Sequence, residues 1–78
     1  MMKYDLYRIT YDYFYEDKGE GPKVLCCETN FKVALRPDAS LIADFNKLAM
    51  DHCARTKKES QYHRYTRVEW MGQVEVMA

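Results

Sequence analysis

The sequence predicts an α+β fold of order β-β-α-β(-β), in which one amphipathic helix packs on one face of an antiparallel sheet. Three observations predict it. Apolar and aromatic residues recur with period two in the first 35 residues, a three- and four-residue period follows, and strand composition then returns. The chain has 78 residues, so we expect a single domain, residues 1–78, with a small core.

The first strand is expected from Met1 to Glu16, a stretch rich in Tyr, Ile, Thr and Phe that contains no Gly or Pro. Its odd-numbered positions form an aromatic stripe, because alternate residues of a strand share one face. The stripe comprises Tyr7, Ile9, Tyr11, Tyr13 and Tyr15. The opposite face is more mixed in character.

A turn is expected at Asp17–Pro22, where two glycines, a proline and charged residues break any regular element. The second strand is expected from Lys23 to Leu35, which makes an antiparallel hairpin with the first. Its odd-numbered face is the more apolar one, so we expect the helix to cover that face.

The helix is expected from about Ala39 to Arg55 or Thr56, with Asp38 or Ser40 as its cap. Apolar positions at helical spacing predict its buried stripe. They are Leu41, Ile42, Phe45, Leu48, Ala49, His52 and Cys53.

Strand composition returns after a polar connection at 56–61. The segment 62–77 predicts either one bulged strand or two strands in a hairpin that turns near Met71 and Gly72. We favour the hairpin, because Gly72 is the residue there that adopts a positive φ at low cost.

The composition makes several function classes less favoured, although a neutral sum does not exclude nucleic acid, because charges can segregate. Twelve basic and twelve acidic residues sum to zero net charge, whereas a free-standing nucleic-acid binder usually carries a basic excess. No metal-ligand spacing, phosphate loop or nucleophile–base pair is present, so we expect no enzyme activity, no metal and no cofactor. Three cysteines without a disulfide pattern and no long apolar run lead us to expect a soluble, reduced, cytoplasmic protein that binds no membrane.

Two interpretations of the aromatic stripe stay open, namely packing within the fold and an interface for another molecule. A helix of about 17 residues spans roughly 25 Å, while the first strand spans over about 40 Å, so the hairpin tip should overhang the helix. Aromatic anchors beside an acidic rim suit a protein contact. The first predicted contact region is Tyr11, Asp12, Tyr13, Tyr15, Glu16 and Asp17, and the second is Tyr62, Arg64 and Tyr65.

A basic, aromatic stretch offers an alternative function. Cations and aromatic rings along a strand can hold the phosphates and bases of single-stranded nucleic acid. The residues that would do so are Arg55, Lys57, Lys58, Arg64, Tyr65 and Arg67. A solvated connection that enters an edge strand is the ordinary interpretation, and a homodimer formed through an exposed strand is compatible with either function.

The architecture resembles the small proteins that bacteriophages encode to disable host defence, including several anti-CRISPR families. The features that carry the resemblance are the short chain, the β-β hairpin, the helix that opens at Pro37–Phe45 and the closing strand at Tyr65–Gly72. The resemblance implies a protein of a phage or mobile element that acts without catalysis, by occupying a surface of a nucleoprotein complex in a bacterial host. It transfers no residue role.

Overall fold

The structure of the chain is a computed structural model that describes residues 2–17, 23–57 and 60–76. At residues 16, 17, 23, 60–63 and 65 it describes the backbone alone. The predicted turn therefore lies, apart from Asp17, outside the described residues, as does part of the polar connection at 56–61.

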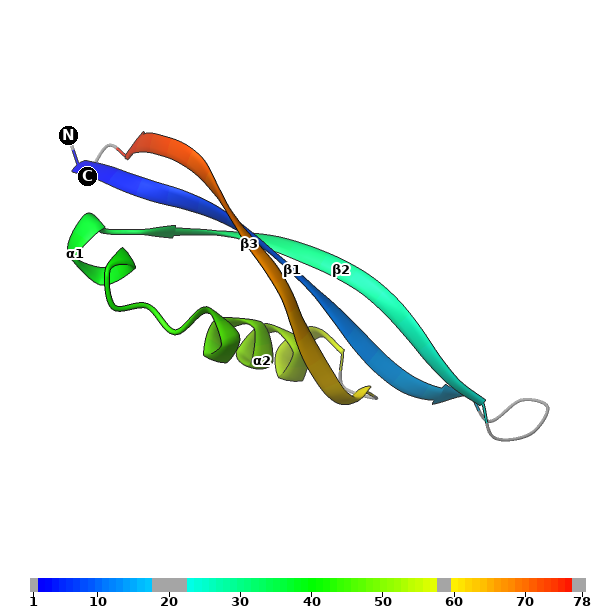
Figure 1. Cartoon of the computed structure of the whole chain (residues 1–78). Helices are drawn as coiled ribbons and strands as arrows, with labels where there is room; N and C mark the ends of the chain where they lie inside the picture. Colours follow the sequence, from blue (N-terminus) through cyan, green and yellow to red (C-terminus); the bar gives the residue numbers. More distant parts are fainter. Residues whose placement is uncertain (1, 18–22, 58–59, 77–78) are drawn as a thin grey trace.

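Three strands form one antiparallel sheet in the order β2-β1-β3. They are β1 (Met2–Asp17), β2 (Lys23–Leu35) and β3 (Ser60–Val76). The sheet is long and twisted, and α2 (Phe45–Thr56) lies along one face of it (Figure 1). The molecule measures 54 × 21 × 16 Å. The arrangement of one antiparallel sheet with α2 on one face confirms the predicted α+β fold. No helix within the described residues is long and apolar enough to cross a membrane.

The third strand is continuous, so the favoured hairpin at Gly72 is wrong. β3 pairs with β1 from Ser60 opposite Tyr15 to Val76 opposite Met2, with three register shifts on the way. Gly72, at φ 100°, lies at one of these shifts. A β1 strand of this length offers ladder hydrogen bonds to the whole segment, and a strand that folded back on itself would give them up.

The predicted single helix is in fact two. A short turn, α1 (Pro37–Ser40), is separated from α2 by an irregular segment, residues 41–44. Asp44 caps α2, because its side chain accepts a hydrogen bond from the backbone N–H of Lys47 at 3.1 Å. The expected caps are therefore wrong, and Leu41 and Ile42 do not join the buried stripe.

The core lies between α2 and the odd-numbered face of β1 and β2. Ile9, Tyr11 and Ala49 are fully buried, and Cys53 is nearly so. The residues that pack around them are Tyr13, Phe31, Val33, Phe45, Leu48 and Val68. This confirms that the helix covers the odd-numbered face of β2. We call this side of the sheet the covered face, and the even-numbered side the open face.

Candidate functional site

The hairpin tip carries the outer half of the aromatic stripe. Tyr13 and Tyr15 lie on the covered face with their rings stacked, 6.2 Å between centroids. The Nζ of Lys57, just after α2, lies 5.0 Å from the centroid of the Tyr13 ring. Both tyrosines are half-buried, and the ends of β1 and β2 run past the end of α2 (Figure 1). The tip thus overhangs the helix as predicted, although Tyr13 also packs against the core.

Tyr11 does not belong to a surface, which corrects its place in the first predicted contact region. Its side chain is fully buried, and its Oη lies 2.6 Å from Nδ1 of His52 on α2. Burial raises the pKa of the Tyr11 hydroxyl. The period-two pattern placed Tyr11 on the correct face, but α2 lies directly over it, so it serves the fold.

Asp12 lies on the open face, away from the tyrosines. Its Oδ2 is 3.4 Å from a terminal guanidinium nitrogen of Arg64 on β3, and its side chain is mostly buried. The structure thereby joins one residue from each predicted contact region and separates Asp12 from the stripe. The side chains of the other predicted members lie outside the described residues, namely Glu16, Asp17, Tyr62 and Tyr65.

The basic residues of the nucleic-acid alternative are divided between two sides of the molecule. Arg64 and Arg67 are on the open face, and Arg67 Nε lies 3.1 Å from Glu69 Oε1. Arg55 and Lys57 belong to the end of α2, over the covered face. The side chains of Lys58 and Tyr65 lie outside the described residues. The described cations therefore do not line one groove.

An ion-pair cluster occupies the middle of the open face. Arg8 donates from a terminal nitrogen to Glu69 Oε2 at 2.9 Å, and Arg67 approaches the same carboxylate. The hydrogen bond from Arg8 holds the pKa of Glu69 below its usual range. Thr10 lies between these residues and is buried. Its backbone carbonyl accepts a hydrogen bond from the Thr66 hydroxyl. The two arginines thus neutralise the Glu69 carboxylate, while Arg8 Nε and Thr10 Oγ1 are buried without a hydrogen-bond partner among the described residues.

Residues with metal or nucleophile chemistry are dispersed. Cys26 is exposed on the open face, Cys27 is half-buried on the covered face, and Cys53 lies in the core. Within residues 2–17, 23–57 and 60–76 no group of three or more His, Cys, Asp and Glu side chains could hold a metal ion. His52 stacks on Phe31, with 4.1 Å between ring centroids, and so is part of the packing.

Three exposed apolar side chains, which the sequence did not reveal as a group, belong to two segments that Asp5 joins. One oxygen of this carboxylate accepts a hydrogen bond from Ser40 Oγ at 3.0 Å, and the other accepts one from Trp70 Nε1 at 3.3 Å. The carboxylate thus ties the end of α1 to β3. Leu41 and Ile42 follow Ser40 directly. Each is 86% exposed, and Trp70 is 63% exposed. We call these three side chains the Trp70 patch.

The sequence did contain one signal for this patch. Asp44 lies three residues before Lys47, which is the spacing of an N-cap whose carboxylate accepts from a backbone N–H. A helix that starts at Phe45 excludes Leu41 and Ile42 from the stripe. Leu41 and Ile42 also fit the helical spacing of the apolar residues, which predicted an earlier start of the helix.

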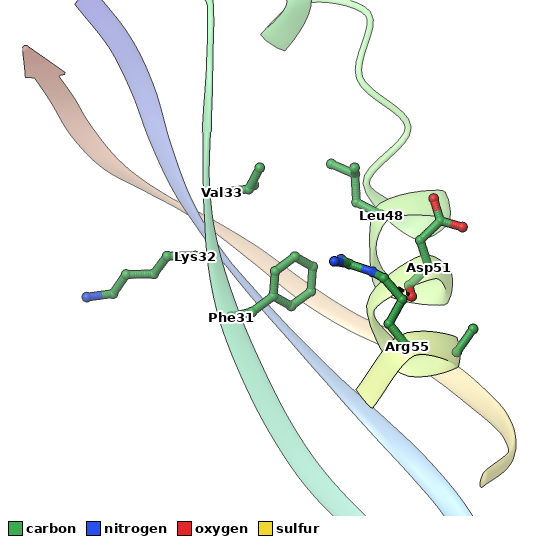
Figure 2. Close-up of a pocket in the computed structure, with 7 residues that line it drawn as sticks. Phe31, Lys32, Val33, Leu48, Asp51 and Arg55 are labelled. Carbon is green, nitrogen blue, oxygen red and sulfur yellow. Dashed lines mark hydrogen bonds between the residues drawn. The ribbon is translucent and has the colours of Figure 1, made fainter. Parts of the chain in front are cut away.

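A groove runs between β2 and α2 (Figure 2). Its volume is about 470 Å³, and it is lined by Phe31, Lys32, Val33, Leu48, Asp51, Ala54 and Arg55. Phe31 and Val33 point toward α2, whereas the side chain of Lys32 points away from it (Figure 2). The groove exists because α2 lies over β1 and β3 and leaves the covered face of β2 partly open.

Comparison of the chain with known protein families, with curated proteins and with solved structures finds no match in any of the three.

Proposed function

We propose that this protein is a non-catalytic binding protein that docks by its surface onto another protein or nucleoprotein complex. The observation that supports this most is the Trp70 patch. Large apolar side chains that a small monomer leaves in water, grouped at one place, are typical of interaction sites. Tryptophan is also enriched among the residues that dominate interface energies.

The energetic gain from covering the patch is substantial. Burying a Leu or Ile side chain contributes about 1.5–3 kcal/mol, and Leu41 and Ile42 keep almost all of that gain available for a partner. An indole contributes a still larger area, with its N–H already satisfied by Asp5.

The patch is also organised in advance of binding. Asp5 is held by Ser40, Trp70 and, at 3.5 Å, by Gln73 Nε2. These bonds restrain the indole and the start of the segment that carries Leu41. Restraint lowers the entropy that is lost on association, so more of the apolar gain becomes affinity.

The chemistry of the patch favours a protein surface as the ligand, since it presents apolar groups and one carboxylate rather than cations for phosphates. Following the resemblance in architecture, we propose that the partner is a host-defence complex of the CRISPR-Cas kind in a bacterial cytoplasm. The protein would come from a phage or mobile element and would block that complex by occupying it.

The test measures binding of the purified chain to a panel of purified CRISPR effector complexes, and their cleavage of target DNA. We expect the wild-type chain to bind one complex and to stop cleavage. The variant Ile42→Ser with Trp70→Ala should lose both effects while its far-UV spectrum is unchanged. Glu75→Ala, at an exposed β3 residue outside the patch, is the matched control and should retain them.

Two results would contradict the proposal. If the chain binds none of the complexes, the defence-inhibitor role is excluded. If the patch variant binds as tightly as the wild type, the Trp70 patch is not the contact surface. Binding to single-stranded nucleic acid that weakens steeply with salt would favour the alternative function instead.

The hairpin tip is tested separately. Tyr13→Ala with Tyr15→Ala removes the stacked pair at the end of the sheet. If the variant folds and binds its partner like the wild type, the tip is not part of the contact surface.

A further inference from the structure

The structure contains two free sheet edges, and they differ in how well they are protected. β3 has three register shifts against β1, which twist an edge and discourage pairing. β2 pairs with β1 without a shift from Leu35 to Lys23, and it contains no Gly or Pro. A long, regular edge of this kind is a template for another strand.

Two charged residues of β2 lie opposite like charges of β1. Glu28 lies opposite Asp12 of β1, and Lys32 lies opposite Arg8, so each faces a like charge. Asp12 and Arg8 are already paired with residues of β3. In the part of the chain that the structure describes, no ion pair includes Glu28 or Lys32, and both are exposed. Like charges directly opposite on a sheet are destabilising.

A second copy of the chain resolves this pattern. We propose that two copies pair antiparallel through β2, with a twofold axis that passes between the two Asn30 residues. Glu28 of each copy then lies opposite Lys32 of the other, which forms two ion pairs on the open face. Other registers lose these ion pairs. An axis through residue 29 or residue 31 places Glu28 or Lys32, respectively, opposite Asn30. An axis through residue 28 or residue 32 places two Glu28 or two Lys32 residues opposite each other.

The same register matches the covered face. Val33 of one copy meets Cys27 of the other, and Leu35 meets Leu25, so apolar side chains meet apolar ones. A twofold axis normal to the sheet puts both α2 helices on the same side. The two grooves between β2 and α2 then adjoin, and their open apolar floors, including Phe31 and Val33, become continuous.

This inference is independent of the proposed function. Trp70 lies on β3, at the opposite edge of the sheet from β2, so the dimer leaves Trp70 free. Each outcome below therefore bears on the dimer and not on partner binding.

The experiment measures the dimer dissociation constant by sedimentation for the wild type, for Glu28→Lys, for Lys32→Glu and for the double variant. Each single reversal places like charges across the axis twice, so we expect dimerisation to weaken about tenfold or more. The double variant restores two opposite-charge pairs and should dimerise like the wild type. Within the chain each reversal faces an opposite charge, so at concentrations where the wild type is monomeric the single variants should unfold at a temperature no lower than the wild type.

A cross-link tests the register itself. In the proposed pairing Ala34 lies opposite Cys26 of the second copy, whereas the two Cys26 residues are far apart. The variant Ala34→Cys should form a covalent dimer on mild oxidation, and the same variant with Cys26→Ser should not. A chain that is monomeric at all concentrations, a dimer that the single reversals leave unchanged, or a dimer lost on Trp70→Ala would overturn the proposal.

Discussion

The hydroxyl of Tyr11 lies 2.6 Å from Nδ1 of His52, and this contact joins the centre of β1 to α2 across the core. Burial raises the pKa of the phenol, so the hydroxyl stays protonated at neutral pH and can donate to Nδ1. The ring that accepts this donor at Nδ1 is the neutral ring with its proton on Nε2. The two rings meet edge to face, with 5.7 Å between their centroids.

We predict that acid destabilises the fold through His52. Burial, with help from Arg55 and Lys57, lowers the pKa of His52 below 6.5. The folded state thus favours the neutral ring, so the stabilisation is complete above pH 6.5 and is lost as the pH falls through the lower folded-state pKa. Urea unfolding between pH 7.5 and 5 measures this. His52→Gln, which can accept from Tyr11 without titrating, should flatten the dependence, and an equally steep curve for it would contradict the prediction.

The hydrogen bond itself should be measurable with Tyr11→Phe. The change keeps the ring in the core and removes only the donor, so we expect a loss of about 0.5–1.5 kcal/mol in the free energy of unfolding. Tyr4→Phe, at a half-buried position away from His52, is the control and should have a smaller effect. Equal losses for the two variants would mean that the Tyr11 contact contributes nothing specific.

Truncation of a core residue should destabilise the fold far more than truncation of a residue of the Trp70 patch. Ile9 is fully buried, so Ile9→Ala should cost about 2–5 kcal/mol in the free energy of unfolding, measured with urea at neutral pH. Leu41 is 86% exposed, so Leu41→Ala should change that free energy by less than about 0.5 kcal/mol. A large loss for Leu41→Ala would place this residue in the core and remove it from the Trp70 patch.

The start of α2 is predicted to depend on Asp44. Asp44→Ala removes the side chain that accepts from the Lys47 N–H and should cost about 1 kcal/mol. Asp38→Ala should cost much less, because Asp38 lies inside the four-residue α1 and is exposed. Chemical unfolding of both variants checks this, and the reverse order would restore the single long helix.

Gly72 is expected to be intolerant of a side chain for a backbone reason. Its φ is 100°, and a Cβ added there would meet no atom within 4 Å, so space is not the constraint. The strain of a positive φ should cost Gly72→Ala about 1–2 kcal/mol, measured by thermal unfolding. Glu75→Ala, three residues further along the strand, should cost little. A neutral Gly72→Ala would show that the strand relaxes around the irregularity.

The sequence by itself determined the α+β class, the hairpin of β1 and β2, and the face of β2 that the helix covers. These features are local, because a period of two or of three to four residues is written in neighbouring positions. The bounds of β2 were predicted correctly, and the overhang of Tyr15 followed from element lengths alone.

Only the tertiary structure decided which members of each stripe are buried. Tyr11 and Tyr15 follow the same period, yet one lies under α2 and the other at the half-buried tip. Leu41 and Ile42 fit the helical stripe but precede a helix that Asp44 starts at Phe45. Likewise the pairing of Asp12 with Arg64, and of Asp5 with Trp70, joins residues more than 50 positions apart. Periodicity specifies a face, but burial depends on what packs against it, and that is set by contacts between distant parts of the chain.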